Sequence, residues 1–418
     1  MTGRLAGVDL ARFLALAGMM AAHVLRAENS AVQEVVTDLV DGRAAALFAV
    51  LAGLSLGLLT ARVPRPLRTR ARVGVVVRGL LVAALGLLLV LLKTRVAVIL
   101  PYYGVAFLLV VPALFARARL LLPLAVGWLL LAPVVGFQLR ADLPFTPGAQ
   151  PGPAALGDPL ALLRLLLLTG YYPVLGWVGY LLLGLGLSRL LRPAVEVAAD
   201  AAATDGPTPA PVTTAVPAAV PAAVPARTAL RLLVVGAMVA AAAALSSRVL
   251  LGPVGLAREL TLTREAASLL GLGGTGGEPA ALADATFYGT VPTTSRAWLA
   301  VAAPHSGAPL DLLHTAGIAV AVLGACLLLP RLVLAIALPL RALGSMPLSA
   351  YAGHLLALRL YPAHTWEVLA GQLLLGCLLA TAWRAAFGRG PLETVVGEAA
   401  RSVARVVPAR PVGPARTS

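Results

Sequence analysis

The sequence has few charged residues and very few cysteines. Only 12% of its 418 residues are charged, whereas 59% are hydrophobic and the mean hydropathy is +0.90. A water-soluble domain of this length needs a polar surface that this composition does not supply, so a soluble fold is excluded. Cys326 and Cys377 each lie inside an apolar run, which argues against a disulfide framework and against a cysteine-based metal site.

The motifs of soluble enzymes are also missing. There is no P-loop and no G-x-S-x-G, and the glycine-rich segment GLGGTGG at 271–277 follows no strand-like run. Without an H-x3-H pair we expect no bound metal. A formal charge of +15 would suggest a nucleic-acid partner in a soluble protein. Here the arginines are concentrated between apolar runs, so we expect no nucleic-acid partner.

Long apolar runs make up most of the chain. Each is about 20 residues long, the length that an α-helix needs to cross the hydrocarbon core of a bilayer. The runs predict an all-α, polytopic transmembrane bundle of about ten helices, near 7–26, 44–62, 73–92, 96–116, 119–138, 171–190, 229–247, 308–329, 346–361 and 365–386.

Arginine-rich loops predict the orientation of these helices. Residues 62–72 and the tail after Gly388 hold five arginines each, and such loops stay on the cytoplasmic side. By parity, the segments 27–43, 139–170 and 248–307 then lie outside. We therefore expect a multi-pass protein of the plasma (inner) membrane with both termini in the cytoplasm.

Two segments interrupt the pattern of spans. Residues 330–344 are apolar but short and carry two arginines, and if they crossed, the basic tail would lie outside. We expect an interfacial or re-entrant helix there. Residues 195–227, rich in alanine and proline, cannot bury a core and predict a disordered cytoplasmic linker. The expected organisation is thus six helices in 1–194, the linker at 195–227, four helices in 228–387 and a basic cytoplasmic tail at 388–418.

The first predicted helix carries ionisable residues that lipid tolerates poorly. Asp9 and Arg12 lie near its cytoplasmic end, and His23 lies near its outer end. Arg12 and His23 are about three turns apart and share one face, with Leu16 and Met19 between them, along roughly 16 Å of helix. This face would line a passage. The alternative is that Asp9 and Arg12 form an ion pair at headgroup level while Leu16 and Met19 only pack against neighbouring helices.

Arg78 lies about one turn inside the cytoplasmic end of the third predicted span. Its side chain would either snorkel to the membrane surface or stand beside Arg12 as a second cation. Two guanidiniums suit the phosphates of a polyanionic ligand such as a nucleotide or a coenzyme. Arg12, Arg78 and Asp9 are therefore the expected binding residues for such a ligand.

Histidines gather at the outer ends of the predicted helices. His23, His305 and His364, three of the five histidines, fall at this face together with Asp41. They would form a general-base or proton-handling cluster. His354 lies within the ninth predicted span, where a packed polar contact is the simpler expectation.

Tyrosines fall at the same face. Tyr102 and Tyr103 belong to PYYG, and Tyr172 belongs to GYYP. Tyrosines at this depth either form the interfacial aromatic belt or contact a substrate.

Several segments, taken in order, resemble a known family. RLAGVDLARFLALAGMMAAH followed by DGRAAALFAVLAGLSLGLL is similar to the opening of the heparan-α-glucosaminide N-acetyltransferase-like bacterial membrane proteins and of the related DUF418 (YeiB-type) group. The likeness continues through VVVRGLLVAALG, ILPYYGVAFLL, LLTGYYPVLGWVGYLLLGLGLSRL, PHSGAPLDLLHTAGIAVAVLGACLLL and LRALGSMPLSAYAGHLL. It covers the chain except for the linker and the tail.

The resemblance implies a transmembrane acyltransferase. Such an enzyme moves an acetyl or other acyl group from cytoplasmic acyl-CoA to an acceptor amine or hydroxyl, for example on a sugar or envelope glycan, at the outer face. The resemblance implies that Asp9 and Arg12 lie on the cytoplasmic donor side. His23 falls at the position where lysosomal relatives carry an active-site asparagine. The lumenal histidine of those relatives has no match in ENSAVQEVVTDL, so glucosamine is not implied as the acceptor. Direct transfer is favoured, and transfer through a covalent acyl-His23 intermediate is the second option.

Together, the residues and the resemblance predict specific roles. Arg12 and Arg78, with Asp9, would bind the acyl-CoA co-substrate, and His23 would act as the general base. The further expected site residues are His305 and Asp41 in catalysis and Tyr102, Tyr103, Tyr172 and His364 in acceptor binding.

Other functions remain open at this point. About ten helices with a few intramembrane charges also suit a transporter or flippase without acyl-transfer chemistry, although the two halves show no obvious inverted repeat. A structural or signalling membrane protein is a third reading. The expected partners are the lipid bilayer and a small-molecule or glycan acceptor, and a homo-oligomer is left open.

Overall fold

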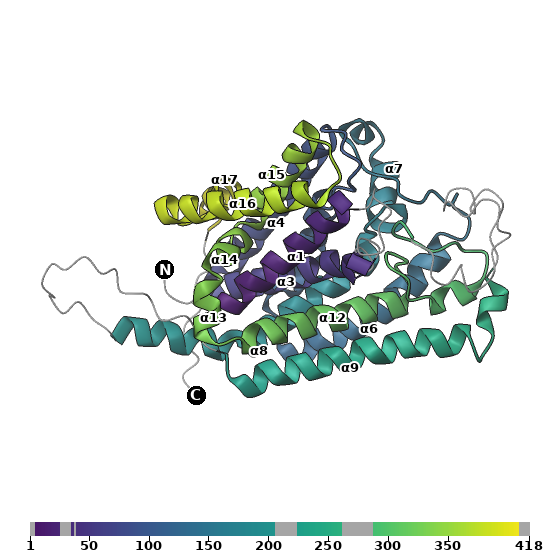
Figure 1. Ribbon diagram of the computed structural model, residues 1–418, viewed down its shortest axis with the longest axis horizontal. Coiled ribbons are helices and arrows are strands. Elements are labelled where there is room, and N and C mark those ends of the chain that lie inside the picture. The colour runs from purple at the N-terminus through teal and green to yellow at the C-terminus, as the bar shows by residue number, and fades with distance from the viewer. Residues whose placement is uncertain (1–4, 26–34, 37–38, 205–223, 261–286, 409–418) are drawn as a thin grey trace, which may run out of the picture.

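A computed structural model of the chain describes residues 5–25, 35–36, 39–204, 224–260 and 287–408, with only the backbone described over 192–204. All regular structure within these ranges is helical. Helices α6, α8, α9 and α12 run alongside one another in the lower half of the view (Figure 1).

Eight helices in the described part of the chain are long and apolar enough to cross a membrane. They are α1 (Ala6–Leu25), α3 (Arg43–Thr60), α4 (Arg68–Val90), α6 (Ala118–Leu139), α8 (Val174–Thr204), α9 (Ala226–Leu251), α12 (Pro309–Leu328) and α16 (Trp366–Phe387). They confirm the predicted all-α, polytopic bundle. The other two expected spans form shorter helices, α5 (Leu100–Val110) with its continuation η2 (Val111–Phe115), and α15 (Pro347–Leu360).

The segment expected to be interfacial or re-entrant, 330–344, forms two short helices. These are α13 (Arg331–Ile336) and α14 (Leu338–Gly344). At about 1.5 Å per residue, each is too short to cross a bilayer. The break between them falls at Ala337, just before Pro339 begins to restrict the backbone.

Most of the expected linker, 195–227, lies outside the described residues. Helix α8 continues to Thr204, and residues 205–223 are not described, nor are the glycine-rich segment 271–277 and the tail from 409.

The C-terminal helix α17 (Pro391–Val406) packs against α4 and α15. The remaining short helices are η1 (Arg65–Leu67), η3 (Pro153–Gly157), α7 (Pro159–Arg164), η4 (Leu165–Thr169), η5 (Leu256–Glu259) and η6 (Arg296–Ala300).

Helices α9 and α12 form the most extensive helix pair, and small residues let them approach. A Cβ at position 236 would lie 2.6 Å from Gly317 O, and a Cβ at position 317 would lie 2.7 Å from Gly236 O. Only glycine fits at both positions without a shift of backbone. Since lipid provides no hydrophobic driving force between helices, such close backbone packing is a main source of their association.

Helix α1 lies inside the bundle, in contact with α3, α12, α14, α15 and α16. Most of its length is buried, so its polar residues face protein rather than lipid. Gly344, at the end of α14, lies directly against the backbone of Asp9 and Phe13, where a Cβ would not fit. This contact holds α14 against the half of α1 that carries Arg12.

Candidate functional site

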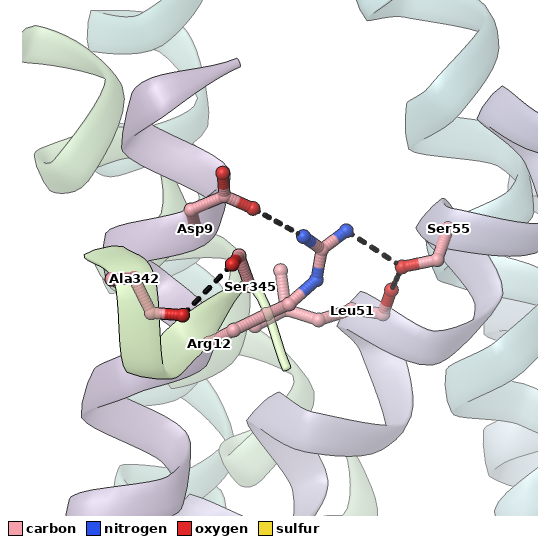
Figure 2. A network of polar contacts seen from close by, with 6 residues as sticks. All are labelled: Asp9, Arg12, Leu51, Ser55, Ala342 and Ser345. Carbon is pink, nitrogen blue, oxygen red and sulfur yellow. Dashed lines mark hydrogen bonds and ion pairs between the residues drawn. The ribbon is translucent and has the colours of Figure 1, made fainter. Parts of the chain in front are cut away.

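Arg12 is held between two helices by a polar network (Figure 2). Its Nη1 donates to Asp9 Oδ1 at 2.6 Å, and its Nη2 donates to Ser55 Oγ of α3 at 2.8 Å. The Ser55 hydroxyl in turn donates to Leu51 O. The Asp9–Arg12 ion pair that the sequence left open therefore exists within α1, and the hydrogen bond from Arg12 to Ser55 ties α1 to α3.

A cavity of about 270 Å³ lies beside this network. The two expected guanidiniums, Arg12 and Arg78, both line it, whereas Asp9 is buried and does not. We call it the arginine cavity, and its lining residues are Arg12, Phe48, Leu51, Ala52, Ser55, Leu56, Leu59, Arg78, Val82, Leu100, Tyr103, Phe107, Pro347, Leu348 and Glu393.

The two arginines of this cavity differ in whether an acidic side chain already pairs with them. Arg12 already neutralises Asp9, whereas Arg78 is half-buried and makes no hydrogen bond or ion pair with any residue that the structure describes. Arg78 is thus the stronger candidate to bind a phosphate.

Glu393 also lines the arginine cavity and brings a carboxylate to it, which the sequence did not predict. Its Oε1 accepts from Leu348 N at 2.7 Å, and its Oε2 accepts from Ser349 Oγ at 2.6 Å. These groups belong to the first turn of α15, whose backbone N–H groups have no partner within the helix. Glu393 therefore caps α15 from α17. The sequence indicates only a basic cytoplasmic tail at 388–418 and does not predict this contact.

A second, larger cavity of about 590 Å³ lies at the other end of α1. It gathers five of the predicted site residues, His23, Asp41, Tyr172, His305 and His364, from segments far apart in the chain. We call it the histidine pocket. Its other lining residues are Met19, Ala22, Val40, Gly42, Ala44, Ala45, Arg95, Val96, Ala97, Pro147, Gly148, Gln150, Tyr171 and Tyr288.

Asp41 and His305 form a pair in this pocket, with His305 Nε2 3.0 Å from Asp41 Oδ1. The other ring nitrogen of His305, Nδ1, is buried and has no hydrogen-bond partner among the described residues. The edge of the ring packs against Tyr171 and Tyr172. His305 thus offers no ring nitrogen to a molecule in the pocket. It is instead placed to hold the Asp41 carboxylate.

His23 lies on the same wall and contacts a second histidine. Its Nδ1 is 3.1 Å from Nε2 of His354 on α15, and the two rings are stacked with centroids 5.3 Å apart. His354 is the packed polar contact that the sequence suggested, and its partner is His23. His364, across the pocket, donates from Nδ1 to Val24 O at 3.1 Å, which fixes the start of α16 to the end of α1.

Tyr172 is the predicted tyrosine that reaches the histidine pocket. It lies in the turn before α8. Burial raises the pKa of the Tyr172 hydroxyl well above its usual range, so the group stays protonated. It can therefore donate a hydrogen bond at neutral pH.

Tyr102 and Tyr103 do not line this pocket. The Tyr102 hydroxyl donates to Ala149 O at 3.3 Å and accepts from Tyr171 N at 3.2 Å, so it supports the loop behind the pocket. Tyr103 lines the arginine cavity instead. Neighbouring residues on a helix point about 100° apart, and here the two adjacent tyrosines contact different parts of the structure.

The two cavities share no lining residue. The Tyr103 hydroxyl donates at 3.1 Å to the carbonyl of Ala45, which lines the histidine pocket, and its ring stacks on Phe48. These contacts join residues of the arginine cavity to a residue of the histidine pocket. Leu16, expected along a passage, is buried and lines neither cavity, whereas Met19 lines the histidine pocket.

Sequence reasoning missed three polar residues of the pocket wall, Arg95, Gln150 and Tyr288. All three come from loops, where no periodicity indicates which side chains face inward. In the part of the chain that the structure describes, no three histidine, cysteine or acidic side chains gather in a metal-binding group.

Comparison with known proteins gives one match. Residues 4–216 match the model of a family described as "Heparan-alpha-glucosaminide N-acetyltransferase, catalytic". This range is slightly more than half of the chain and contains Arg12, His23, Asp41, Arg78 and Tyr172. No curated protein and no solved structure matches the chain.

Proposed function

Because the chain belongs to the heparan-alpha-glucosaminide N-acetyltransferase catalytic family, we propose that it carries an acetyl or other acyl group from acyl-CoA at the arginine cavity to an amine or hydroxyl in the histidine pocket. The family is one of transmembrane acetyltransferases, and the helical bundle agrees with that class. The acceptor that we propose is a sugar or envelope glycan.

The observation that carries this proposal is the placement of α1. One helix presents Arg12 to a cavity that also holds Arg78, and His23 to a pocket that holds Asp41 and Tyr172. The two substrates need different groups. The donor needs cations that bind its phosphates, and the acceptor needs a base that takes its proton. About 16 Å of helix separates the two residues, a span that the extended pantetheine arm suits.

The proposed donor side is cytoplasmic. The arginine-rich segment 62–72 leads directly into α4, which carries Arg78. Such segments stay in the cytoplasm, so we place the arginine cavity at that face of the plasma membrane, with both termini on the same side. The acyl group then has to pass the contact between Tyr103 and Ala45, which must open during the reaction.

The proposed chemistry needs one base and one hydrogen-bond donor. The acceptor nitrogen or oxygen attacks the thioester carbonyl while His23 takes its proton. The Tyr172 hydroxyl supplies a donor for the oxyanion that forms, and Asp41, held by His305, binds the acceptor. The C–S bond then breaks, and the proton passes from His23 to the departing thiolate. The products are the acylated acceptor and the free thiol of CoA.

A transporter remains the second candidate, and the division between the two cavities is the observation that favours it. A transporter that works by alternating access also needs a barrier that opens and closes between its two sides, and the contact between Tyr103 and Ala45 could form one. A transporter would leave the thioester intact.

Purified protein in detergent, given acetyl-CoA and a panel of sugar and amine acceptors, tests the proposed function. We expect release of the CoA thiol that requires both the protein and a suitable acceptor, with one equivalent of acylated acceptor for each thiol. Acetyl-CoA binding without thiol release over the whole panel would instead support the transporter.

Replacing Arg78 by alanine is expected to weaken acyl-CoA binding by about 10- to 100-fold, because a charge-assisted hydrogen bond contributes about 1.5–3 kcal/mol. Lysine at this position keeps the positive charge but lacks the planar guanidinium that binds a phosphate through two hydrogen bonds, so it should restore part of the affinity. Isothermal titration with acetyl-CoA measures both. Arg331→Ala, at an exposed position away from both cavities, is the matched control. Unchanged affinity in Arg78→Ala would leave this arginine with a snorkelling role.

A further inference from the structure

Three polar side chains from three helices form a line that begins in the histidine pocket. His23 Nδ1 of α1 lies 3.1 Å from His354 Nε2 of α15, and His354 Nδ1 lies 2.6 Å from Gln372 Oε1 of α16. Both nitrogens of His354 are therefore engaged, one by each neighbour. Nothing in the proposed chemistry so far uses His354 or Gln372.

The surroundings of His354 are almost entirely apolar. It is buried, and with Gln372 it borders a separate cavity of about 310 Å³ whose other walls are mostly aliphatic, including Met20, Leu343 and Leu375. A buried imidazole there needs its hydrogen bonds, because an unmade one costs about 1–3 kcal/mol. The direction of each bond in the line is therefore strongly constrained.

The direction of the bonds follows from the chemistry of the groups. A carbonyl oxygen only accepts, so His354 Nδ1 carries a proton and donates it to Gln372 Oε1. A neutral imidazole has one N–H, which leaves His354 Nε2 with a lone pair. That lone pair accepts from His23 Nδ1–H. Neutral His23 then has its own lone pair on Nε2.

We propose that His354 and Gln372 are positioning residues that hold His23 in the tautomer protonated at Nδ1, with Nε2 as the basic nitrogen. This inference rests on the proposed role of His23 as general base, but the tautomer itself is independent of activity. His354 touches neither the arginine cavity nor the histidine pocket, so it acts only through His23.

Nitrogen-15 NMR of the wild-type protein with labelled histidine tests the tautomer directly. Protonated and unprotonated ring nitrogens differ in chemical shift, and the chain has only five histidines, so the spectrum of a His23→Asn variant assigns the His23 signals. We expect a protonated Nδ1 and an unprotonated Nε2 for His23. A proton on His23 Nε2, as when the Gln372 amide nitrogen donates, would overturn the proposal.

Kinetics of His354 variants test the consequence for the reaction. His354→Leu should lower kcat by roughly 10- to 100-fold, because His23 then loses the partner that fixes its basic nitrogen. The KM for acyl-CoA should stay within about twofold, since the donor cavity is separate. His354→Gln provides an amide oxygen as acceptor and should recover most of kcat. An unchanged kcat in His354→Leu, or equal losses in both variants, would contradict a positioning role.

His314→Leu is the matched control, because His314 Nδ1 bonds Ala240 O on another helix and lines neither of the two cavities. Its kcat should equal that of the wild type. Failure of the proposed function is recognised separately. If the wild-type protein transfers no acyl group, the NMR measurement still decides whether His354 and Gln372 set the tautomer of His23.

Discussion

Replacement of His23 by alanine is expected to lower kcat for acyl transfer by about 10³-fold, within the range of 10²–10⁴ that a general base contributes. His23 is the histidine of α1 that borders the histidine pocket, whereas His305 turns one nitrogen to Asp41 and buries the other. Without His23, the acceptor must lose its proton to water or to a weaker base. Binding of acyl-CoA should stay within about twofold, because the arginines that bind its phosphates lie in a separate cavity.

Single-turnover kinetics with acetyl-CoA, together with titration of acetyl-CoA binding, measure these two effects separately. His314→Ala, which removes a histidine of α12 outside both cavities, serves as the control. Equal rates in His23→Ala and the wild type would exclude His23 as the base. A loss of acyl-CoA affinity equal to the loss of rate would show that His23 binds the donor rather than acting as the base.

Replacing Asp41 by asparagine is expected to lower kcat/KM for the acceptor by about 10²- to 10³-fold. The Asp41 carboxylate, held by His305 at 3.0 Å, is the anionic group that we propose binds the acceptor amine or hydroxyl. The loss of a charge-assisted hydrogen bond accounts for the first ten- to hundredfold, and misplacement of the acceptor accounts for the rest. The donor KM should not change.

The pairing also predicts how the effects of substituting Asp41 and His305 combine. His305→Ala should lower kcat/KM less than Asp41→Asn, and the double variant should be no worse than Asp41→Asn alone, because His305 acts through Asp41. Steady-state kinetics over a range of acceptor concentrations measure this, with Asp142→Asn in an exposed turn as the control. Losses that add in the double variant would instead show that His305 contributes independently of Asp41.

The grouping at the histidine pocket could be predicted because membrane topology constrains it. Spans of about 20 residues alternate in direction, so the loop before α3 and the loop before α12 must meet at one face. Asp41 and His305 lie 264 residues apart and still form a pair. The hydropathy of the spans predicted the fold for the same reason, since each helix must satisfy its own backbone hydrogen bonds in lipid.

Side-chain direction within the bundle could not be predicted in the same way. Tyr103 faces the arginine cavity because of the rotation of α5, which is set by its packing against α4 and α8. A helix that is apolar all round carries little information about its rotation. Contacts made by segments near the C-terminus depend on tertiary packing alone. One example is the contact of Glu393, in α17, with the first turn of α15. His354 could be predicted as a packed contact, but its partner on α1 could not.

Transfer across a sealed bilayer is the measurement that tests the central claim most directly. Protein would be reconstituted in one orientation into liposomes with acceptor trapped inside and labelled acetyl-CoA supplied outside, on the side of the arginine cavity. We predict labelled acceptor inside the liposomes, free CoA outside, and neither with His23→Ala. Acylation only when donor and acceptor share one side, or entry of intact acetyl-CoA, would contradict acyl transfer from the arginine cavity to the histidine pocket.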